Sequence, residues 1–303
     1  MSNTVVRSHG GVRKTRTFVR PAAVGLCVIL LTLLAASCGG KSSTSTPAKS
    51  TSPKKQQGLS VVKSWFVDDT THLEPMQVPG VAAVSANTLF VAFVASDSGQ
   101  GPARGGPPLD GKIQSVDGGS LTWTRQAEAH LSITGEPSIA EIWTAFSAVP
   151  VKPFTVTVTR NNDNGALTNC DNYEGGSGPD IANGMVLVQA ITGADPKNPI
   201  GAKATAGVGK MSGRVAPAFV TLTTTRAGSL VAAVGADWSD PKPRTIPAGQ
   251  VMIHEDLSTP NGDAYWVQGL TGPVATPGPV TLSVSAPTED DCNMAAVEVL
   301  SAH

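Results

Sequence analysis

Phe154-Thr-Val-Thr-Val-Thr159 is the stretch that most directly indicates the fold of this 303-residue chain. Apolar and hydroxyl side chains alternate along it with a period of two. This places Phe154, Val156 and Val158 on one face of an extended strand and the threonines on the other. Val280-Thr-Leu-Ser-Val-Ser285 repeats the scheme. Such a period, in segments rich in β-branched residues, is typical of antiparallel strands with one buried face.

Other runs predict strands that are covered on both faces. Thr88–Ala95, Met185–Ile191 and Leu230–Val234 are almost wholly apolar, and turn sequences such as Asn164-Gly and Asn183-Gly stand between the runs. No segment shows a sustained helical period. We therefore predict an all-β chain, folded as an antiparallel, jelly-roll-like two-sheet sandwich of about ten strands.

An internal repeat divides the predicted domain, residues 59–303, into halves at about 87–195 and 228–302. The matched segments follow one another in the same order: Asn87–Asp97 with Gly228–Asp237, Ala140–Thr159 with Asp263–Ser285, and Gly184–Gln189 with Asn293–Glu298. The match places Trp143 and Trp266 at equivalent positions. We expect a single sandwich with approximate two-fold symmetry, because no linker-like stretch separates the halves.

The first 58 residues predict export and anchoring instead of fold. Residues 1–20 are basic without acids, and the apolar run 21–36 is shorter than the ~20 residues that span a bilayer. Leu34-Ala-Ala-Ser-Cys38 resembles a bacterial lipobox, although Ala35 stands where Leu is common. The resemblance implies a signal peptide over 1–37 and a lipid on Cys38; an ordinary signal peptide and an uncleaved anchor are the alternatives. Residues 38–58, rich in Ser, Thr, Pro and Lys, predict a disordered tether.

Two cysteines remain in the predicted domain, Cys170 and Cys292. An exported chain meets an oxidising compartment, and the repeat places both in equivalent loops, so we predict a disulfide between them. Two free thiols are the alternative.

Charge and candidate metal ligands narrow the functional classes. The formal net charge of -1 provides no basic field for nucleic acid. Asp163, Asp171 and Glu174 lie in an Asn- and Asp-rich stretch that offers oxygen ligands for calcium, but their spacing does not fit an EF-hand, and such clusters commonly form turns. We expect no cofactor.

Two further groups of residues bear on binding and catalysis. Trp143 and Trp266, with Glu141 and Gln268 on the same strand faces, would suit stacking against a glycan if exposed; burial in the core is the other interpretation. HExxH and GxSxG motifs are absent from the sequence. A hydrolase would have to use strand acids such as Glu141, Asp237 and Glu255 as a carboxylate pair.

Several short motifs resemble a β-sandwich module that recurs in large secreted repeat proteins of environmental bacteria. They are Ser120-Leu-Thr-Trp123, Ala140-Glu-Ile-Trp143, Thr223–Leu230, Gly262–Gln268 and Asn293–Glu298. The resemblance implies an extracellular β-fold without catalysis and supplies no site residues. We therefore predict a lipoprotein of the bacterial cell envelope that acts as a binding or structural module, with glycan or an envelope protein as candidate partners. A secreted carbohydrate-active hydrolase is the alternative.

Overall fold

The computed structural model describes residues 58–69, 75–83, 85–97, 113–130, 138–160, 183–208, 216–239, 241–259, 262–289 and 291–302. All of them belong to one compact unit, Pro53–His303. In these ranges no helix is long and apolar enough to cross a membrane.

The described residues form fifteen β-strands, which confirms the all-β prediction with more strands than expected. The first eight are β1 (Ser60–Asp69), β2 (Met76–Ala83), β3 (Thr88–Asp97), β4 (Ile113–Asp117), β5 (Thr124–His130), β6 (Ser138–Ser147), β7 (Val151–Arg160) and β8 (Gly184–Thr192). The remaining seven are β9 (Ile200–Val208), β10 (Phe219–Thr223), β11 (Leu230–Asp237), β12 (Gln250–Ser258), β13 (Asp263–Leu270), β14 (Pro279–Ser283) and β15 (Cys292–Val299).

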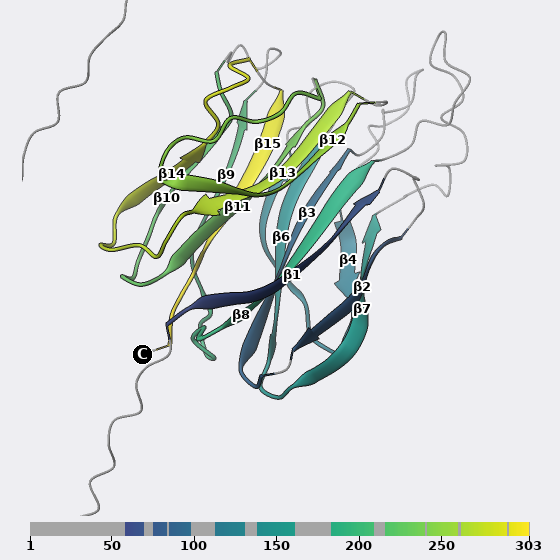
Figure 1. Ribbon diagram of the computed structural model, residues 1–303, viewed down its shortest axis with the longest axis vertical. Coiled ribbons are helices and arrows are strands. Elements are labelled where there is room, and N and C mark those ends of the chain that lie inside the picture. Colours follow the sequence, from purple (N-terminus) through teal and green to yellow (C-terminus); the bar gives the residue numbers. More distant parts are fainter. Residues whose placement is uncertain are drawn as a thin grey trace, which may run out of the picture. The chain divides into compact units, whose positions relative to one another are not determined.

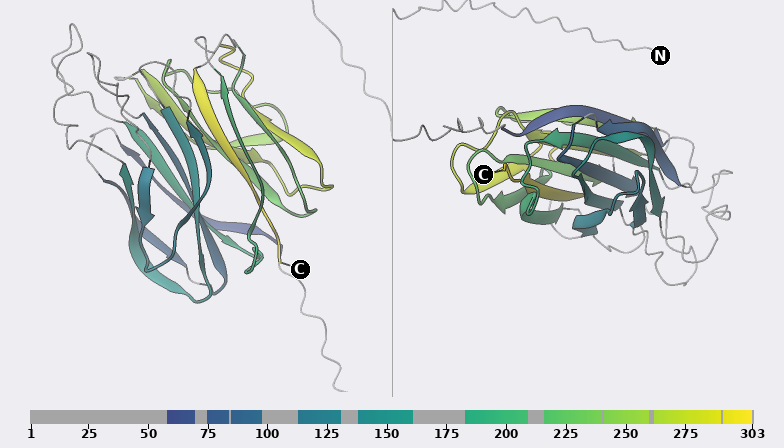
Figure 2. Two further views of the ribbon diagram at one scale, coloured as in Figure 1. Left: turned by 180° about the vertical axis from the view of Figure 1, so that it is seen from behind. Right: turned by 90° about the horizontal axis from the view of Figure 1, so that it is seen from below.

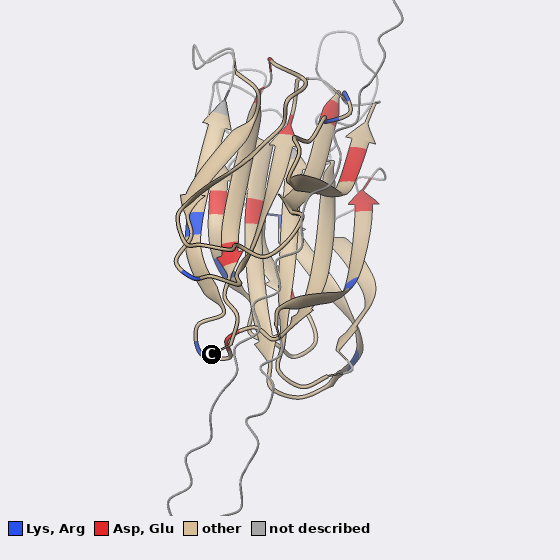
Figure 3. Cartoon of the chain, turned by 60° about the vertical axis from the view of Figure 1, so that its left-hand side comes forward, with Lys and Arg blue, Asp and Glu red and all other residues tan. Residues whose placement is uncertain are grey.

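The strands make four sheets, two large and two small (Figure 1). The N-terminal large sheet has the order β1-β8-β3-β6-β5, and the C-terminal large sheet has the order β12-β13-β11-β15-β9. The N-terminal small sheet is β2-β7-β4, and the C-terminal small sheet is β10-β14. Most of the length of the strands carries no charged side chain (Figure 3), as expected for sheets that pack on other sheets.

The sheets stack in four layers separated by three cores (Figure 2). A central core, which includes Phe93, Ile142 and Val267, lies between the two large sheets. An N-terminal core lies between the first large sheet and its small sheet, where Val156 and Val158 are 0% exposed, as the alternating pattern predicted. A C-terminal core lies between the second large sheet and β10-β14. The double burial of the large sheets explains the almost wholly apolar sequences of β3, β8 and β11.

The internal repeat is therefore a repeat of two-layer sandwiches packed back to back. Reading the C-terminal large sheet in reverse, from β9 to β12, matches β1 with β9, β8 with β15, β3 with β11, β6 with β13 and β5 with β12. In the small sheets β2 and β7 match β10 and β14, whereas β4 has no counterpart among the described strands. Each half thus begins with strands, β1 and β9, that precede the segments matched in the sequence.

The pairing registers fix which residues are equivalent. Thr88 and Ser229 both follow a residue with positive φ, and each hydroxyl bonds to the carbonyl three residues back, at 2.9 and 2.8 Å. With these two aligned, Val94 corresponds to Gly235, and their partners across the strand pair are Glu141 and Trp266.

The sequence match of Trp143 with Trp266 is therefore wrong by two residues. By the same registers Trp143 corresponds to Gln268, because their partners Ala92 and Ala233 are equivalent. A shift of two residues keeps every side chain on the same face of the strand, so the hydrophobic pattern does not reveal it.

Candidate functional site

Glu141 of β6 is a buried carboxyl group in the N-terminal core. Its side chain is 0% exposed, and its Oε2 atom accepts a 2.6 Å hydrogen bond from Nε1 of Trp143. Its Oε1 atom lies 3.4 Å from two donors, Arg125 of β5 and the backbone N–H of Ile113 at the start of β4. Glu141 therefore links three strands and has no surface that a substrate could reach.

The electrostatic setting of Glu141 favours its neutral form. Burial raises the pKa of Glu141 to about 7, and the hydrogen bond from Trp143 and the charge of Arg125 oppose this rise only in part. Glu128, which faces Glu141 in the register of β5 and β6, adds to the rise and forms a 2.8 Å ion pair with Arg125. The two carboxyl groups stand side by side on neighbouring strands and share one guanidinium.

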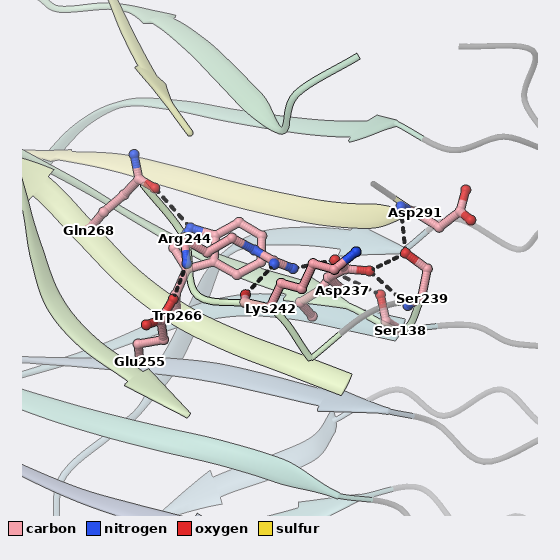
Figure 4. A network of polar contacts seen from close by, with 10 residues as sticks. Ser138, Asp237, Ser239, Lys242, Arg244, Glu255, Trp266, Gln268 and Asp291 are labelled. Atoms are coloured by element: carbon pink, nitrogen blue, oxygen red, sulfur yellow. Dashed lines mark hydrogen bonds and ion pairs between the residues drawn. The ribbon is translucent and has the colours of Figure 1, made fainter. Parts of the chain in front are cut away.

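Trp266 and Gln268 of β13 lie in the C-terminal core, and both are 0% exposed. Nε1 of Trp266 donates a 2.8 Å hydrogen bond to Oε1 of Gln268, and the Gln268 amide donates to the carbonyl of Ser283 at 3.1 Å. The face of Trp266 is covered by Arg244, whose guanidinium lies 4.8 Å from the ring centroid (Figure 4).

The predicted ligand face of Trp143, Trp266, Glu141 and Gln268 is therefore not formed. Trp143 and Glu141 face the N-terminal small sheet, whereas Trp266 and Gln268 face the C-terminal small sheet on the other side of both large sheets. The interpretation as core residues holds for Trp266, and Trp143 is half-buried beneath Arg125, at 5.8 Å from ring centroid to guanidinium.

The two remaining acids of the hydrolase hypothesis hold the segment around Arg244. Asp237, at the end of β11, pairs with the Arg244 guanidinium, and both side chains are 0% exposed. Asp237 also accepts 2.8 Å hydrogen bonds from the N–H and the hydroxyl of Ser239 (Figure 4). Glu255 of β12 accepts a 2.6 Å hydrogen bond from the backbone N–H of Arg244. These acids lie on the C-terminal side and do not face Glu141 across a cleft.

A different group of side chains gathers where β1 and β12, the first strands of the two large sheets, approach each other. We call Phe66, Asp68, His254 and Asp256 the β1/β12 seam. The ring of Phe66 is 56% exposed and lies 4.1 Å from the ring of His254, centroid to centroid. Nε2 of His254 is 2.7 Å from Oδ1 of Asp68. Chain positions 186 residues apart thus meet at the molecular surface.

The carboxyl groups of the seam influence each other. Burial, together with the charge of Asp68, raises the pKa of Asp256 to about 6, and the charge of His254 opposes this rise. Within the described residues, the contact of Asp68 with His254 is the one ion pair that either aspartate makes. The neighbouring Asp69 belongs to a different network, because it pairs with the buried Arg160 at 3.2 Å.

The fold itself does not require these side chains, as the opposite edge shows. The two-fold repeat makes β9 and β5 the counterparts of β1 and β12, and the registers give the counterparts of the seam residues: Thr205 for Phe66, Gly207 for Asp68, Ala127 for His254 and Ala129 for Asp256. Ala127 and Ala129 are 8% and 4% exposed. Small residues thus line one edge of the central core. The other edge carries an aromatic ring, an imidazole and two carboxyl groups.

Sequence reasoning missed the seam entirely. Its residues are separated by most of the chain, and neither the largely apolar sequence of β1 nor a histidine without a second one at metal-ligand spacing indicates a site. The exposure of Phe66 depends on β1 being an outermost strand, which only the sheet order decides.

Several predicted sites lie outside the described residues and stay predictions: the signal peptide, Cys38, the tether up to residue 57, Cys170, Asp163, Asp171 and Glu174. Cys292, the proposed disulfide partner of Cys170, is buried at the start of β15. Within the described ranges no three His, Cys, Asp or Glu side chains are placed to hold a metal ion.

No known family model matches the chain, and neither a curated protein nor a solved structure shows significant similarity to it.

Proposed function

We propose that this chain is a lipid-anchored module of the bacterial cell envelope that binds a partner outside the membrane and has no catalytic role. The observation that carries the proposal is the β1/β12 seam. Its exposed aromatic ring and half-buried polar side chains stand where the repeat has small residues at the other edge. Exposed aromatic groups beside polar ones are typical of recognition surfaces.

The positions of the strand acids in the fold favour a binding function over the alternative, a secreted carbohydrate-active hydrolase. A glycosidase needs two carboxyl groups on either side of a bound sugar. Glu141 is enclosed, and Asp237 and Glu255 are held by Arg244 on the far side of the large sheets. This arrangement supports a structural role for all three.

Anchoring and binding are tested together in one fractionation experiment. The full chain and its Cys38→Ser variant are expressed in a bacterial host with an alkyne-tagged fatty acid. We expect the label and membrane retention for the native chain, and loss of both for Cys38→Ser. The soluble variant is then mixed with isolated cell envelopes and sedimented. We expect it to sediment with the envelopes, whereas Phe66→Thr stays in the supernatant and Thr205→Ser behaves as the parent.

Two outcomes would contradict the proposal. A Cys38→Ser chain that still carries the label would remove the anchor from this cysteine. A chain that fails to sediment with any envelope fraction, or that releases reducing sugar ends from polysaccharide, would remove the binding role.

A further inference from the structure

The β1/β12 seam is polarised along its length. β1 and β12 run toward the same end of the unit, because their last residues lie next to Gly184 and Asp263, and Asp263 accepts a 3.3 Å hydrogen bond from Asn183. Phe66 precedes Asp68, and His254 precedes Asp256. The aromatic ring therefore lies toward one end, the carboxyl groups lie toward the other, and the imidazole of His254 lies between them.

Apolar residues extend the aromatic end. Val61 of β1 and Val251 of β12 are each 42% exposed. Their partners on the neighbouring strands are Ile191 and Gly269, which lie on the strand faces directed at the central core. Both valines therefore project on the same side as the seam residues. The matching edge of β9 is built from small and polar residues such as Thr205 and Lys203. Exposed apolar side chains thus lie on both strands toward the end away from the carboxyl groups, with Ser64 between Val61 and Phe66 on β1.

Among the described residues, the negative charge at the acidic end is incompletely balanced. Lys63, the basic residue of β1, lies over the ring of Trp65 at 5.0 Å, and Trp65 faces the N-terminal core. Arg160 is occupied by Asp69. In the part of the chain that the structure describes, His254 is therefore the one basic side chain beside the carboxyl groups of Asp68 and Asp256. These carboxyl groups could pair with a basic side chain of another molecule.

The backbone at the seam also offers a place for an extended chain. β1 and β12 are each the outermost strand of a large sheet, so the described residues leave one side of each strand without a sheet partner. Exposed strand edges recruit additional strands, through backbone hydrogen bonds and alternate side chains. In an added strand, alternate side chains would lie over Phe66 and beside the carboxyl groups.

We propose that the β1/β12 seam binds an extended segment of a partner protein in which an apolar residue is followed by Lys or Arg. The apolar side chain packs on Phe66 and Val251, and the basic side chain pairs with Asp68 and Asp256. This inference rests on the proposed binding function and names the class of partner. The exposed free edges favour a peptide over a glycan, since the tryptophans that would stack on sugars are enclosed or half-buried.

The test uses the full chain carrying Cys38→Ser and a fluorescein-labelled eight-residue peptide of alternating Val and Lys. A control peptide of the same length has Glu in place of Lys. Fluorescence anisotropy is expected to show binding of the basic peptide at least tenfold tighter than of the acidic one, weakening as salt is added. Phe66→Thr and Asp256→Ala should each weaken binding at least fivefold, and Thr205→Ser should leave it unchanged.

The two key variants carry the residues that the repeat uses at the opposite edge, so the fold tolerates them there. Thermal unfolding by circular dichroism verifies that each variant is folded. Equal affinity for both peptides, or basic-peptide binding that both variants retain, would overturn the proposal. Absence of peptide binding, with Phe66-dependent binding to a glycan array instead, would overturn the partner class and leave the binding function standing. Loss of envelope sedimentation would remove the binding function itself.

Discussion

Glu141 illustrates how burial converts an ordinary side chain into a titrating group near neutrality. Its two oxygen atoms receive one short hydrogen bond and two long ones, which is too little to compensate for the lost hydration of a carboxylate. The equivalent position in the second half is Trp266, whose indole needs no such compensation. The same fold position thus holds an acid in one half and an aromatic ring in the other.

The stability of the protein should therefore depend on pH through Glu141. Below the ordinary value of 4.5 the group is protonated whether the chain is folded or unfolded. Between 4.5 and about 7 only the unfolded chain loses the proton, so the free energy of unfolding falls as pH rises, by up to about 3 kcal/mol. Above that range the contribution is constant.

Urea unfolding of Glu141→Gln and of the native chain at several pH values measures this effect. The difference in unfolding free energy between them is expected to change across this window in favour of the variant. Glu128→Gln, at a more exposed position on β5, is the control and should show a smaller change. Parallel pH curves for the native chain and Glu141→Gln would contradict the burial argument.

Gly235 is the residue that makes room for Trp266. The two are partners across β11 and β13, and a Cβ atom on Gly235 would overlap the indole ring. In the first half the same position is Val94, opposite the smaller Glu141. The first half thus pairs two side chains of medium size at this position, and the second half pairs the largest side chain with the smallest. Both arrangements fill the core.

Gly235→Ala should destabilise the protein by about 1–3 kcal/mol, because the overlap forces Trp266 away from Arg244 and Gln268. Thermal unfolding and the tryptophan fluorescence of the variant, compared with those of the native chain, measure the result. Gly272→Ala, where a Cβ atom meets nothing within 4 Å, is the matched control and should lie close to the native chain. Equal stability of the two variants would show that the ring can move without loss.

At the scale of elements, the outermost strands differ more between the halves than the inner strands do. β3 and β11 are both buried apolar strands, whereas β1 carries Phe66 and Asp68 where β9 carries Thr205 and Gly207. Inner strands are constrained by neighbours on both faces and both sides. Edge strands are free to carry side chains for recognition.

Opposite effects of its two neighbours on Asp256 provide a test of the seam. Asp68→Asn removes a negative charge and should lower the pKa of Asp256 from about 6. His254→Ala removes a group that stabilises the carboxylate and should raise that pKa. Carbon-13 NMR titration of the aspartate carboxyl groups follows both. Asp117→Asn on β4 is the control and should have no effect; a shift of the same sign in both seam variants would show that the two strands do not meet as described.

At the scale of the whole molecule, the central core packs the two sandwiches against each other. It is built from both large sheets, and polar contacts close it at one end. There the Asn293 amide donates a 2.6 Å hydrogen bond to the carbonyl of Ser138 in the other half. Neither half can bury its large sheet without the other.

Phe93→Ala, in the first half of the central core, should therefore destabilise both halves by about 3–5 kcal/mol. Hydrogen exchange with mass spectrometry is expected to show faster exchange in β13 as well as in β6. The conservative Phe93→Leu variant is the control and should have a much smaller effect. Exchange that accelerates in the first half alone would mean that the two sandwiches unfold independently.

The sequence by itself determined the all-β class and the existence of a repeat. Alternation in β7, double burial of β3, β8 and β11, and the order of matched segments depend on local patterning, which one chain records directly. The sequence could not determine which residues of the two halves are equivalent. Gln189 and Glu298 match in sequence, yet their partners Val91 and Val231 lie in different cores, because strands buried on both faces have no polar side to set the register.

Only the tertiary structure decided which residues are enclosed and which are presented. It enclosed Glu141, Trp266 and Gln268, since each large sheet is covered on both faces instead of one. It also brought Phe66 and Asp68 to His254 and Asp256, because the seam forms where the outermost strands of two sheets meet. Contacts between residues so far apart in the chain follow from sheet order and packing, which no local pattern in the sequence records.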